Sequence, residues 1–181
     1  AHGQVQLPQW VDQTSTRLLM PNVTTDPEEK DFETGDFDND GDLDVVCVRK
    51  EPFYGATPKT HFLLMNVNGI LTDMTATLAP GFLIPTLARK PIVGDFDNDG
   101  WLDIIVVNTN SEPPAVPTNF QTDYYRNLGS VNGVWQGFVL ETGRIPIFSP
   151  VPRFCAGGAG DIDNDGDLDL MLGDYNNTLE D

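Results

Sequence analysis

Apolar residues in this chain come in short runs separated by turn-forming residues, and no run keeps the spacing of an amphipathic helix. The runs are rich in Val, Ile, Phe, Tyr and Thr, and Gly, Pro, Asn or Asp stands at their ends, which is the pattern of β-strands. The predicted strands are 30–37, 43–49, 60–66, 70–78, 88–96, 102–108, 123–129 and 135–143.

An internal repeat organises these strands. "GDFDNDGDLDVVC" begins at Gly35, "GDFDNDGWLDIIV" at Gly94 and "GDIDNDGDLDLML" at Gly160, so the copies start 59 and 66 residues apart. A weaker repeat pairs "VDQTSTRL" at 11–18 with "TDMTATL" at 72–78. Four short strands in a unit of about 60 residues indicate one blade of a β-propeller.

The predicted fold class is all-β, a propeller-type array of four-stranded antiparallel blades that occupies residues 1–181 as a single unit. Residues 1–26 are expected to end a preceding blade, 27–80 and 81–145 to form two full blades, and 146–181 to start a further blade. A closed propeller takes at least about four blades. The array is therefore expected to be incomplete: a piece of a longer protein, one of several copies that complete one another, or an open array.

Each strong repeat begins with alternate aspartates around a glycine, a pattern that repels itself unless a cation is bound. Counted from the first aspartate, carboxylates stand at positions 1, 3, 5 and 9 and glycine at position 6. A calcium loop uses side-chain oxygens at 1, 3 and 5, a backbone carbonyl at 7 and a ligand at 9, and glycine permits the sharp turn. The predicted ligand positions are Asp36, Asp38, Asp40, Asp42 and Asp44; Asp95, Asp97, Asp99, Trp101 and Asp103; and Asp161, Asp163, Asp165, Asp167 and Asp169.

These loops are not helix–loop–helix hands. Position 12 holds Cys47, Val106 or Leu172 in place of the bidentate Glu, so the carboxylate at position 9 must close each site. A donor set made only of oxygen disfavours zinc and copper, and Mg²⁺ requires a stricter octahedron with more water. Three Ca²⁺ sites are predicted. The alternative, three solvated acidic turns, is disfavoured because the pattern occurs three times in register.

Other loop positions have expected structural roles. Asparagine at position 4 tolerates unusual backbone dihedral angles. Hydrophobic residues at positions 2 and 8 are expected to pin each loop to the sheet. These residues are Asn39, Asn98 and Asn164 at position 4, Phe37, Phe96 and Ile162 at position 2, and Leu43, Leu102 and Leu168 at position 8.

The motif D-x-D-x-D-G-x-x-D, preceded by Gly and followed by "LDVVC", "LDIIV" or "LDLML", resembles the FG-GAP/VCBS repeat family. That family includes the calcium-binding blades of integrin α-subunit propellers and many secreted bacterial proteins. The resemblance covers about residues 31–181. It implies a β-propeller, Ca²⁺ bound at the aspartates named above, and an extracellular setting.

Charge and the remaining reactive residues narrow the function classes. The net charge is −18, from 28 acidic and 10 basic residues, which argues against nucleic acid and anionic membranes as partners. No apolar run approaches the roughly 20 residues that span a bilayer. Cys47 and Cys155 are predicted to be buried free thiols, and His61 a strand residue and not a base. The sequence also lacks a nucleophile motif, so we predict that the chain is not an enzyme.

The predicted function is that of a non-enzymatic, secreted or cell-surface calcium-binding scaffold for adhesion or structural assembly. Unfinished end blades expose strand edges, so a protein partner or self-assembly into a homo-oligomer or filament is expected.

The alternative is a carbohydrate-binding propeller module of a secreted protein or enzyme. Long inserts at 50–60 and 108–122 fall at the same place in two units and share one face. Aromatic residues in or beside them would stack on a sugar, or would only pack their own loops: Phe53, Tyr54, Phe120, Tyr124 and Tyr125.

Overall fold

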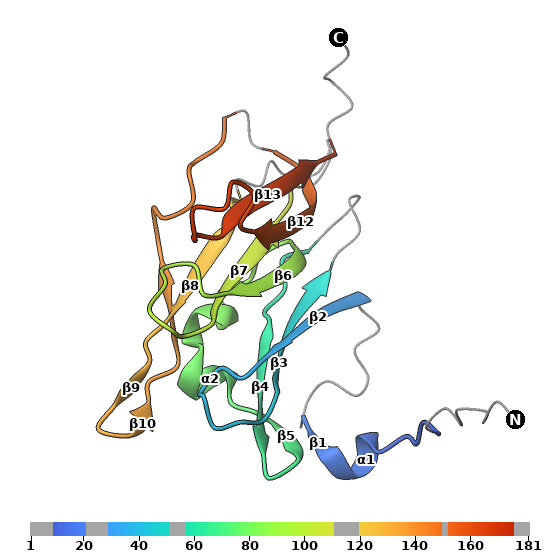
Figure 1. Cartoon of the computed structure of the whole chain (residues 1–181). Coiled ribbons are helices and arrows are strands. Elements are labelled where there is room, and N and C mark those ends of the chain that lie inside the picture. The colour runs from blue at the N-terminus through green and yellow to red at the C-terminus, as the bar shows by residue number, and fades with distance from the viewer. Residues whose placement is uncertain (1–8, 21–28, 51–56, 111–119, 150–151, 176–181) are drawn as a thin grey trace, which may run out of the picture.

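The computed structural model describes residues 9–20, 29–50, 57–110, 120–149 and 152–175. Within these ranges the chain is nearly all β, as predicted. The helical elements are three single turns: α1 (Thr14–Arg17), α2 (Thr75–Leu78) and the 3₁₀ turn η1 (Pro80–Leu83). In Figure 1, β12 and β13 of the third repeat lie above the strands β2 to β5 of the first repeat, and the hairpin of β9 and β10 projects at the lower left.

The first strong repeat folds into a four-stranded antiparallel meander, which we call the first blade. Its strands are β2 (Glu29–Gly35), β3 (Asp44–Lys50), β4 (Phe62–Val67) and β5 (Ile70–Asp73). The acidic loop joins β2 to β3. The short strand β1 (Leu18–Leu19) lies parallel to β5 at the outer edge of this blade.

The second strong repeat forms an equivalent meander, the second blade. Its strands are β6 (Ala88–Gly94), β7 (Asp103–Asn108), β8 (Asp123–Asn127) and β11 (Phe138–Glu141). The hairpin of β9 (Ser130–Val131) and β10 (Val134–Trp135) projects between β8 and β11. The break falls at Gly137, where φ is +75° and a Cβ atom would lie 2.1 Å from the carbonyl oxygen of Leu78. The predicted strand 135–143 is therefore split in two.

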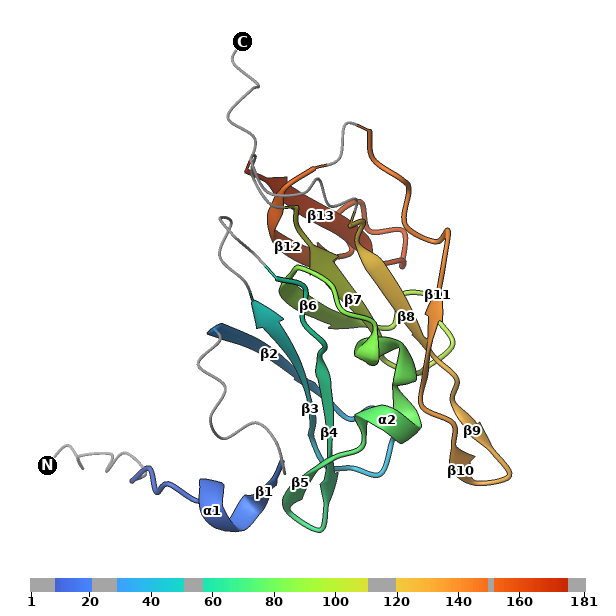
Figure 2. The same ribbon diagram turned by 180° about the vertical axis from the view of Figure 1, so that it is seen from behind.

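The third strong repeat contributes a two-stranded sheet, β12 (Phe154–Gly160) and β13 (Asp169–Asp174). The first two blades are joined into one nine-stranded sheet by a single parallel pair, Lys50 with Ala88. This sheet curls, and β12–β13 stacks beside β6 and β7 (Figures 1 and 2). The prediction of an incomplete propeller-type array is confirmed.

The core lies between successive blades. Val46 and Val48 of the first blade pack with Ile104 and Val106 of the second in one buried cluster. The neighbouring residues of β7, Ile105 and Val107, face the other way and pack against Phe154, Leu170 and Leu172 of the third sheet. Because alternate strand residues point to opposite faces, a blade covered on both sides, such as the second, needs a continuous apolar run such as "IIVV".

The two copies of the weak repeat begin their helical turns in the same way. The expected strand 70–78 ends at Asp73, and α2 follows it, because the Oδ1 atom of Asp73 accepts hydrogen bonds from the backbone N–H (3.0 Å) and hydroxyl (2.6 Å) of Thr75. In the N-terminal copy, the Oδ1 atom of Asp12 accepts from the N–H of Thr14 (2.9 Å) at the start of α1. Such local side-chain bonds favour a turn over an extended chain.

His61 is fully buried just before β4 and joins the first blade to the segment that leads into β6. Its Nε2 atom lies 2.8 Å from the Oγ1 atom of Thr86, and its Nδ1 atom accepts from the backbone N–H of Arg49 at 3.4 Å. Burial, helped by the positive charge of Arg49, lowers the pKa of His61 from 6.5 to about 3. The residue is thus a structural, neutral imidazole.

Acidification is expected to weaken the fold through this residue. Between about pH 6.5 and pH 3, His61 is protonated in the unfolded chain but stays neutral in the folded chain. The contribution of His61 to the free energy of unfolding is therefore fully present above about pH 6.5. As the pH drops from 6.5 to 3, the free energy of unfolding falls by up to about 1.4 kcal/mol per pH unit. Urea unfolding at pH 7 and pH 4.5, for the wild type and His61→Gln, measures the contribution. Between pH 7 and pH 4.5, the free energy of unfolding of the wild type should fall by about 2–3 kcal/mol more than that of the variant. Equal decreases would contradict the assignment of His61 as a buried, neutral residue.

Candidate metal centre

The three acidic loops connect the first two strands of each blade and share one internal geometry. In the first loop, carboxylate oxygens of Asp36, Asp38 and Asp40 lie within 4.8 Å of one another. Asp36 holds the turn, because its Oδ1 and Oδ2 atoms accept from the backbone N–H groups of Asp40 and Gly41, both at 3.0 Å. The turn therefore aims alternate carboxylates at a common point.

The second loop repeats this arrangement. Oxygens of Asp95, Asp97 and Asp99 again lie within 4.8 Å of one another, and Asp95 accepts from the N–H groups of Asp99 (3.0 Å) and Gly100 (2.9 Å). Position 4 in all three loops has a left-handed backbone, as predicted, with φ of +58°, +56° and +61° at Asn39, Asn98 and Asn164. Position 6 is also left-handed, with φ of +98°, +89° and +97° at Gly41, Gly100 and Gly166.

In the third loop the grouping differs by one residue. Asp161 accepts from the N–H groups of Asp165 and Gly166, both at 3.1 Å, so the turn is the same. The carboxylates grouped within 4.8 Å of one another are those of Asp161, Asp163 and Asp169, the first, third and ninth positions. The same loop sequence thus presents its ninth carboxylate to the cluster here.

In the first two loops the ninth aspartate is buried and holds the loop to the third strand of its blade. The Oδ1 atom of Asp44 accepts from the N–H of Asn66 (2.7 Å), and its Oδ2 atom accepts from the N–H of Phe37 (3.1 Å). Asp103 likewise accepts from the N–H groups of Asn127 (2.8 Å) and Phe96 (3.2 Å). Burial raises the pKa of Asp44 and of Asp103 to about 6.

The first two acidic loops each concentrate negative charge in a partly buried place. Burial, followed by the charge of Asp40, raises the pKa of Asp38, and burial, followed by the charge of Asp99, raises the pKa of Asp97. The Oδ1 atoms of Asp42 and Asp97 are buried and accept no hydrogen bond. Oxygen-only donors with unfilled acceptor capacity fit a hard dication such as Ca²⁺.

Neighbouring loops also contact one another. The Nδ2 atom of Asn98 donates to the Oδ1 atom of Asp167 at 2.5 Å, which links the second loop to the third. The leucine at position 8 packs against the glycine that precedes the previous acidic loop: Leu102 against Gly35, and Leu168 against Gly94. These leucines pin adjacent blades together and not only their own loop.

The expectation for positions 2 and 8 is wrong at two places. Phe37 is fully buried, whereas Ile162 is 58% exposed and Leu43 is 59% exposed. Both exposed residues belong to the ends of the array. Leu43 has no preceding blade to pack against within the described residues, and the third sheet has only two described strands to cover Ile162.

Two asparagines that the sequence pattern did not single out hold the backbone of the acidic loops. Asn127 is fully buried; its Nδ2 group donates to the carbonyls of Phe37 (2.9 Å) and Leu102 (3.0 Å), and its Oδ1 atom accepts from the indole of Trp135 (2.8 Å). Asn66 has the equivalent place in the first blade and donates to the carbonyl of Leu43 at 3.3 Å. The sequence does contain a sign of their role, because an asparagine stands near the end of the third strand in both full repeats.

Several predicted roles for other residues are revised. Tyr124 and Tyr125 are 4% and 1% exposed, so they are core residues and do not form a sugar-stacking surface. Phe120 is half-buried, and Phe53 and Tyr54 lie outside the described residues. Both cysteines are free thiols, as predicted, but only Cys47 is buried.

Among the described residues, no helix has the length and apolar character needed to cross a membrane.

Comparison with known proteins agrees with the loop geometry. Residues 36–106 match the family model for the FG-GAP-like repeat. The chain is also 30% identical over 139 residues to cartilage acidic protein 1 of Xenopus tropicalis, an alignment that covers 76% of this chain and 19% of that protein. The chain therefore spans about one fifth of the length of this relative.

Proposed function

Because residues 36–106 belong to the FG-GAP-like repeat family, we propose that the chain is a non-enzymatic, extracellular scaffold for adhesion or structural assembly, rigidified by three Ca²⁺ ions. The observation that carries the proposal is the convergence of three carboxylates in each of the three acidic loops, two of them at positions 1 and 3 in every loop. The name of the relative, cartilage acidic protein 1, supports an extracellular setting and matches the net charge of −18.

The residues define what each ion would do. Bound Ca²⁺ would supply positive charge among the aspartates of a loop. The loop in turn connects two strands of one blade and, through Asn98 and Leu102, touches its neighbours. Metal-binding free energy would thereby become folding free energy. Extracellular calcium modules bind with Kd values of about 10⁻⁴–10⁻³ M, a range that is saturated outside cells.

Isothermal titration with Ca²⁺ tests the proposal. We expect close to three ions per chain, with weaker binding of Mg²⁺. Asp36→Asn, Asp95→Asn and Asp161→Asn should each remove about one site, because each replaces the carboxylate that holds one turn. A chain that takes up no Ca²⁺ in the millimolar range would contradict the proposal.

We further propose that copies of this chain associate through the open faces of their end blades. The outer face of the first blade carries an apolar groove of about 540 Å³, lined among others by Leu18, Met20, Phe32, Val45 and Cys47. The corresponding face of the second blade is covered by the first blade, and that of the third sheet by the second. The groove therefore lies on the one face of this kind that no neighbouring blade covers within the described residues, whereas the same face is covered in the second blade and in the third sheet.

The two ends of the array offer complementary halves of that contact. At one end, Leu43 is exposed and lacks the glycine against which Leu102 and Leu168 pack. At the other end, Gly160, the repeat equivalent of Gly35 and Gly94, has open space around it, and Met171 is 64% exposed. The third sheet of one copy would meet the first blade of the next, which is a head-to-tail contact that yields a ring or a filament.

Sedimentation at millimolar Ca²⁺ over a concentration series checks this association. We expect particles heavier than the 19.9 kDa single chain. Leu43→Glu should return them to single chains by placing a charge in the apolar contact. Leu83→Glu changes a leucine that is 48% exposed elsewhere on the surface and should leave the assembly intact. A wild type that stays a single chain throughout would rule out self-assembly.

A further inference from the structure

The second loop differs from the other two because a cationic side chain of the protein reaches its carboxylates. The Nη2 atom of Arg144 lies 3.3 Å from the Oδ2 atom of Asp97, the residue at position 3. No other aspartate of the three loops forms an ion pair with a Lys or Arg in the described part of the chain. The second loop alone therefore contains an internal counter-charge.

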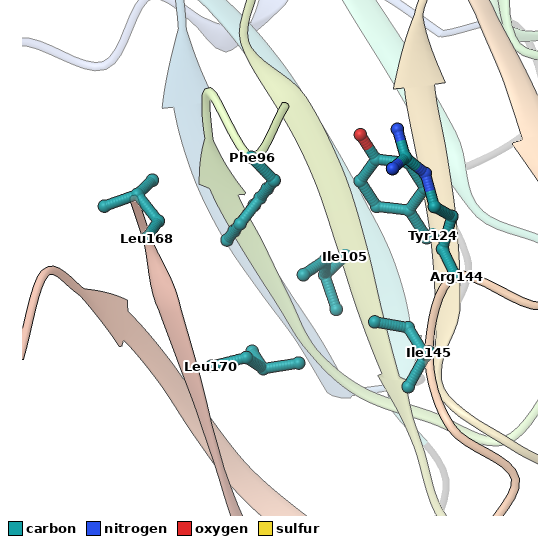
Figure 3. A pocket seen from close by; sticks show the side chains of 7 residues that line it. All are labelled: Phe96, Ile105, Tyr124, Arg144, Ile145, Leu168 and Leu170. Carbon is teal, nitrogen blue, oxygen red and sulfur yellow. The ribbon is translucent and has the colours of Figure 1, made fainter. Parts of the chain in front are cut away.

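Two further contacts hold Arg144 in this place. Its Nε atom donates to the Oε2 atom of Glu141 at 2.9 Å, and its guanidinium carbon lies 5.3 Å from the ring centre of Tyr124. Figure 3 shows the guanidinium beside the Tyr124 ring at the edge of a cavity of about 210 Å³. The planar guanidinium of arginine can lie over an aromatic ring while separate nitrogen atoms contact two carboxylates, as Arg144 does with Glu141 and Asp97.

The cavity lies where the second and third repeats meet. Phe96 comes from position 2 of the second loop and Leu168 from position 8 of the third, while Ile105 and Leu170 form the apolar walls (Figure 3). Arg144 reaches this boundary from the segment directly after β11. Its position therefore links the second metal loop to the contact between blades.

The second loop also has the smallest acidic charge. Position 7 is Asp42 in the first loop and Asp167 in the third, but Trp101 in the second. The number of charged ligands and the net charge around them tune the affinity of calcium loops. The missing carboxylate at position 7 and the Arg144 contact both make the second loop less negative, and both therefore weaken its attraction for a cation.

We infer that Arg144 is an affinity-setting residue: it neutralises Asp97 in the metal-free second loop and opposes Ca²⁺ binding there. The inference rests on the proposed calcium function. A dication among Asp95, Asp97 and Asp99 repels the guanidinium and competes with it for the same carboxylate. The first and third loops fill first as calcium rises, and the second loop stays ordered without the ion because Arg144 replaces part of its charge.

The size of the effect follows from the exposure of the pair. The side chain of Arg144 is 47% exposed and that of Asp97 is 18% exposed, so water and salt screen the interaction. Removing the guanidinium should therefore strengthen ion binding at the second loop by about 3- to 10-fold, and not by orders of magnitude. The gain should shrink at high ionic strength.

Trp101 makes the second loop separately observable. Tb³⁺ is a luminescent substitute for Ca²⁺, and indole excitation sensitises Tb³⁺ bound close by. Trp101→Phe identifies the part of the signal that comes from this loop. The titration compares the wild type with Arg144→Gln and with a matched control, Arg17→Gln, which removes an arginine of α1 whose Nη1 atom donates to the carbonyl of Gly69 in the first blade.

We expect the Trp101-dependent signal of Arg144→Gln to reach half-saturation at about 3- to 10-fold lower Tb³⁺ than in the wild type, with Arg17→Gln within about 2-fold of the wild type. A signal that appears only in Arg144→Gln would support the inference more strongly. Equal affinities in Arg144→Gln and the wild type would overturn it while leaving the calcium function intact. Absence of the signal from every variant, together with no Ca²⁺ uptake by calorimetry, would overturn both.

Discussion

Removal of calcium with EDTA is expected to lower the melting temperature of this chain by about 2–16 °C, and millimolar Ca²⁺ should restore it more fully than Mg²⁺. Each ion bound at about 1–10 times its Kd adds RT ln(1 + [Ca²⁺]/Kd), which is about 0.4–1.4 kcal/mol. Three sites then contribute about 1–4 kcal/mol, and each kcal/mol moves the melting temperature of a domain of this size by about 2–4 °C. The negative charge concentrated in each metal-free loop acts in the same direction.

Differential scanning calorimetry in EDTA, CaCl₂ and MgCl₂ measures this shift. The matched control is the triple variant Asp36→Asn, Asp95→Asn and Asp161→Asn, which removes one carboxylate from each loop. It should melt at the same temperature in EDTA and in Ca²⁺. A wild type whose transition does not move between these buffers would refute the idea that the ions stabilise the blades.

Asn127→Ala is expected to destabilise the fold by about 3–5 kcal/mol, the largest effect of any single substitution proposed for this chain. The side chain is fully buried and bonds to the carbonyls of Phe37 and Leu102 and to the indole of Trp135. Phe37 belongs to the first loop and Leu102 to the second, so one amide joins two blades. Its loss leaves several buried polar groups without partners, and each costs about 1–3 kcal/mol.

The chain contains its own control for this prediction. Asn66 has the same place in the first blade and bonds to the carbonyl of Leu43 and the N–H of Gly69, but it is only half-buried, and among the described residues its side chain forms no hydrogen bond with another blade. Asn66→Ala should therefore cost about 1–2 kcal/mol. Urea unfolding in Ca²⁺ compares the two variants, and equal losses would show that the inter-blade bonds contribute nothing.

Much of the fold is predictable from the sequence because two signals are local. Strand pairs such as β6 and β7 require continuous apolar runs, since neighbouring blades cover both faces, and "PIVG" and "DIIVVN" show this directly. The acidic turns follow from the alternation of aspartates with Asn39 and Gly41, whose backbone angles are set by residue type. Repetition then places each unit relative to the next.

The features that escaped prediction depend on contacts between distant residues. Gly137 interrupts a predicted strand because the carbonyl of Leu78, far away in the sequence, occupies the space of a Cβ atom. Tyr124 and Tyr125 lie next to a long insert and yet point into the two cores on either side of the second blade. Arg144 approaches Asp97 from a segment that the sequence does not mark as part of the site.

The most direct test of the central claim is an anomalous difference map from crystals grown in millimolar CaCl₂. We predict three peaks, one in each acidic loop, with calcium–oxygen distances of about 2.3–2.6 Å to aspartate carboxylates and the carbonyl at position 7. Well-ordered loops with no anomalous density, on sheets that are otherwise intact, would contradict the claim that calcium holds these blades together.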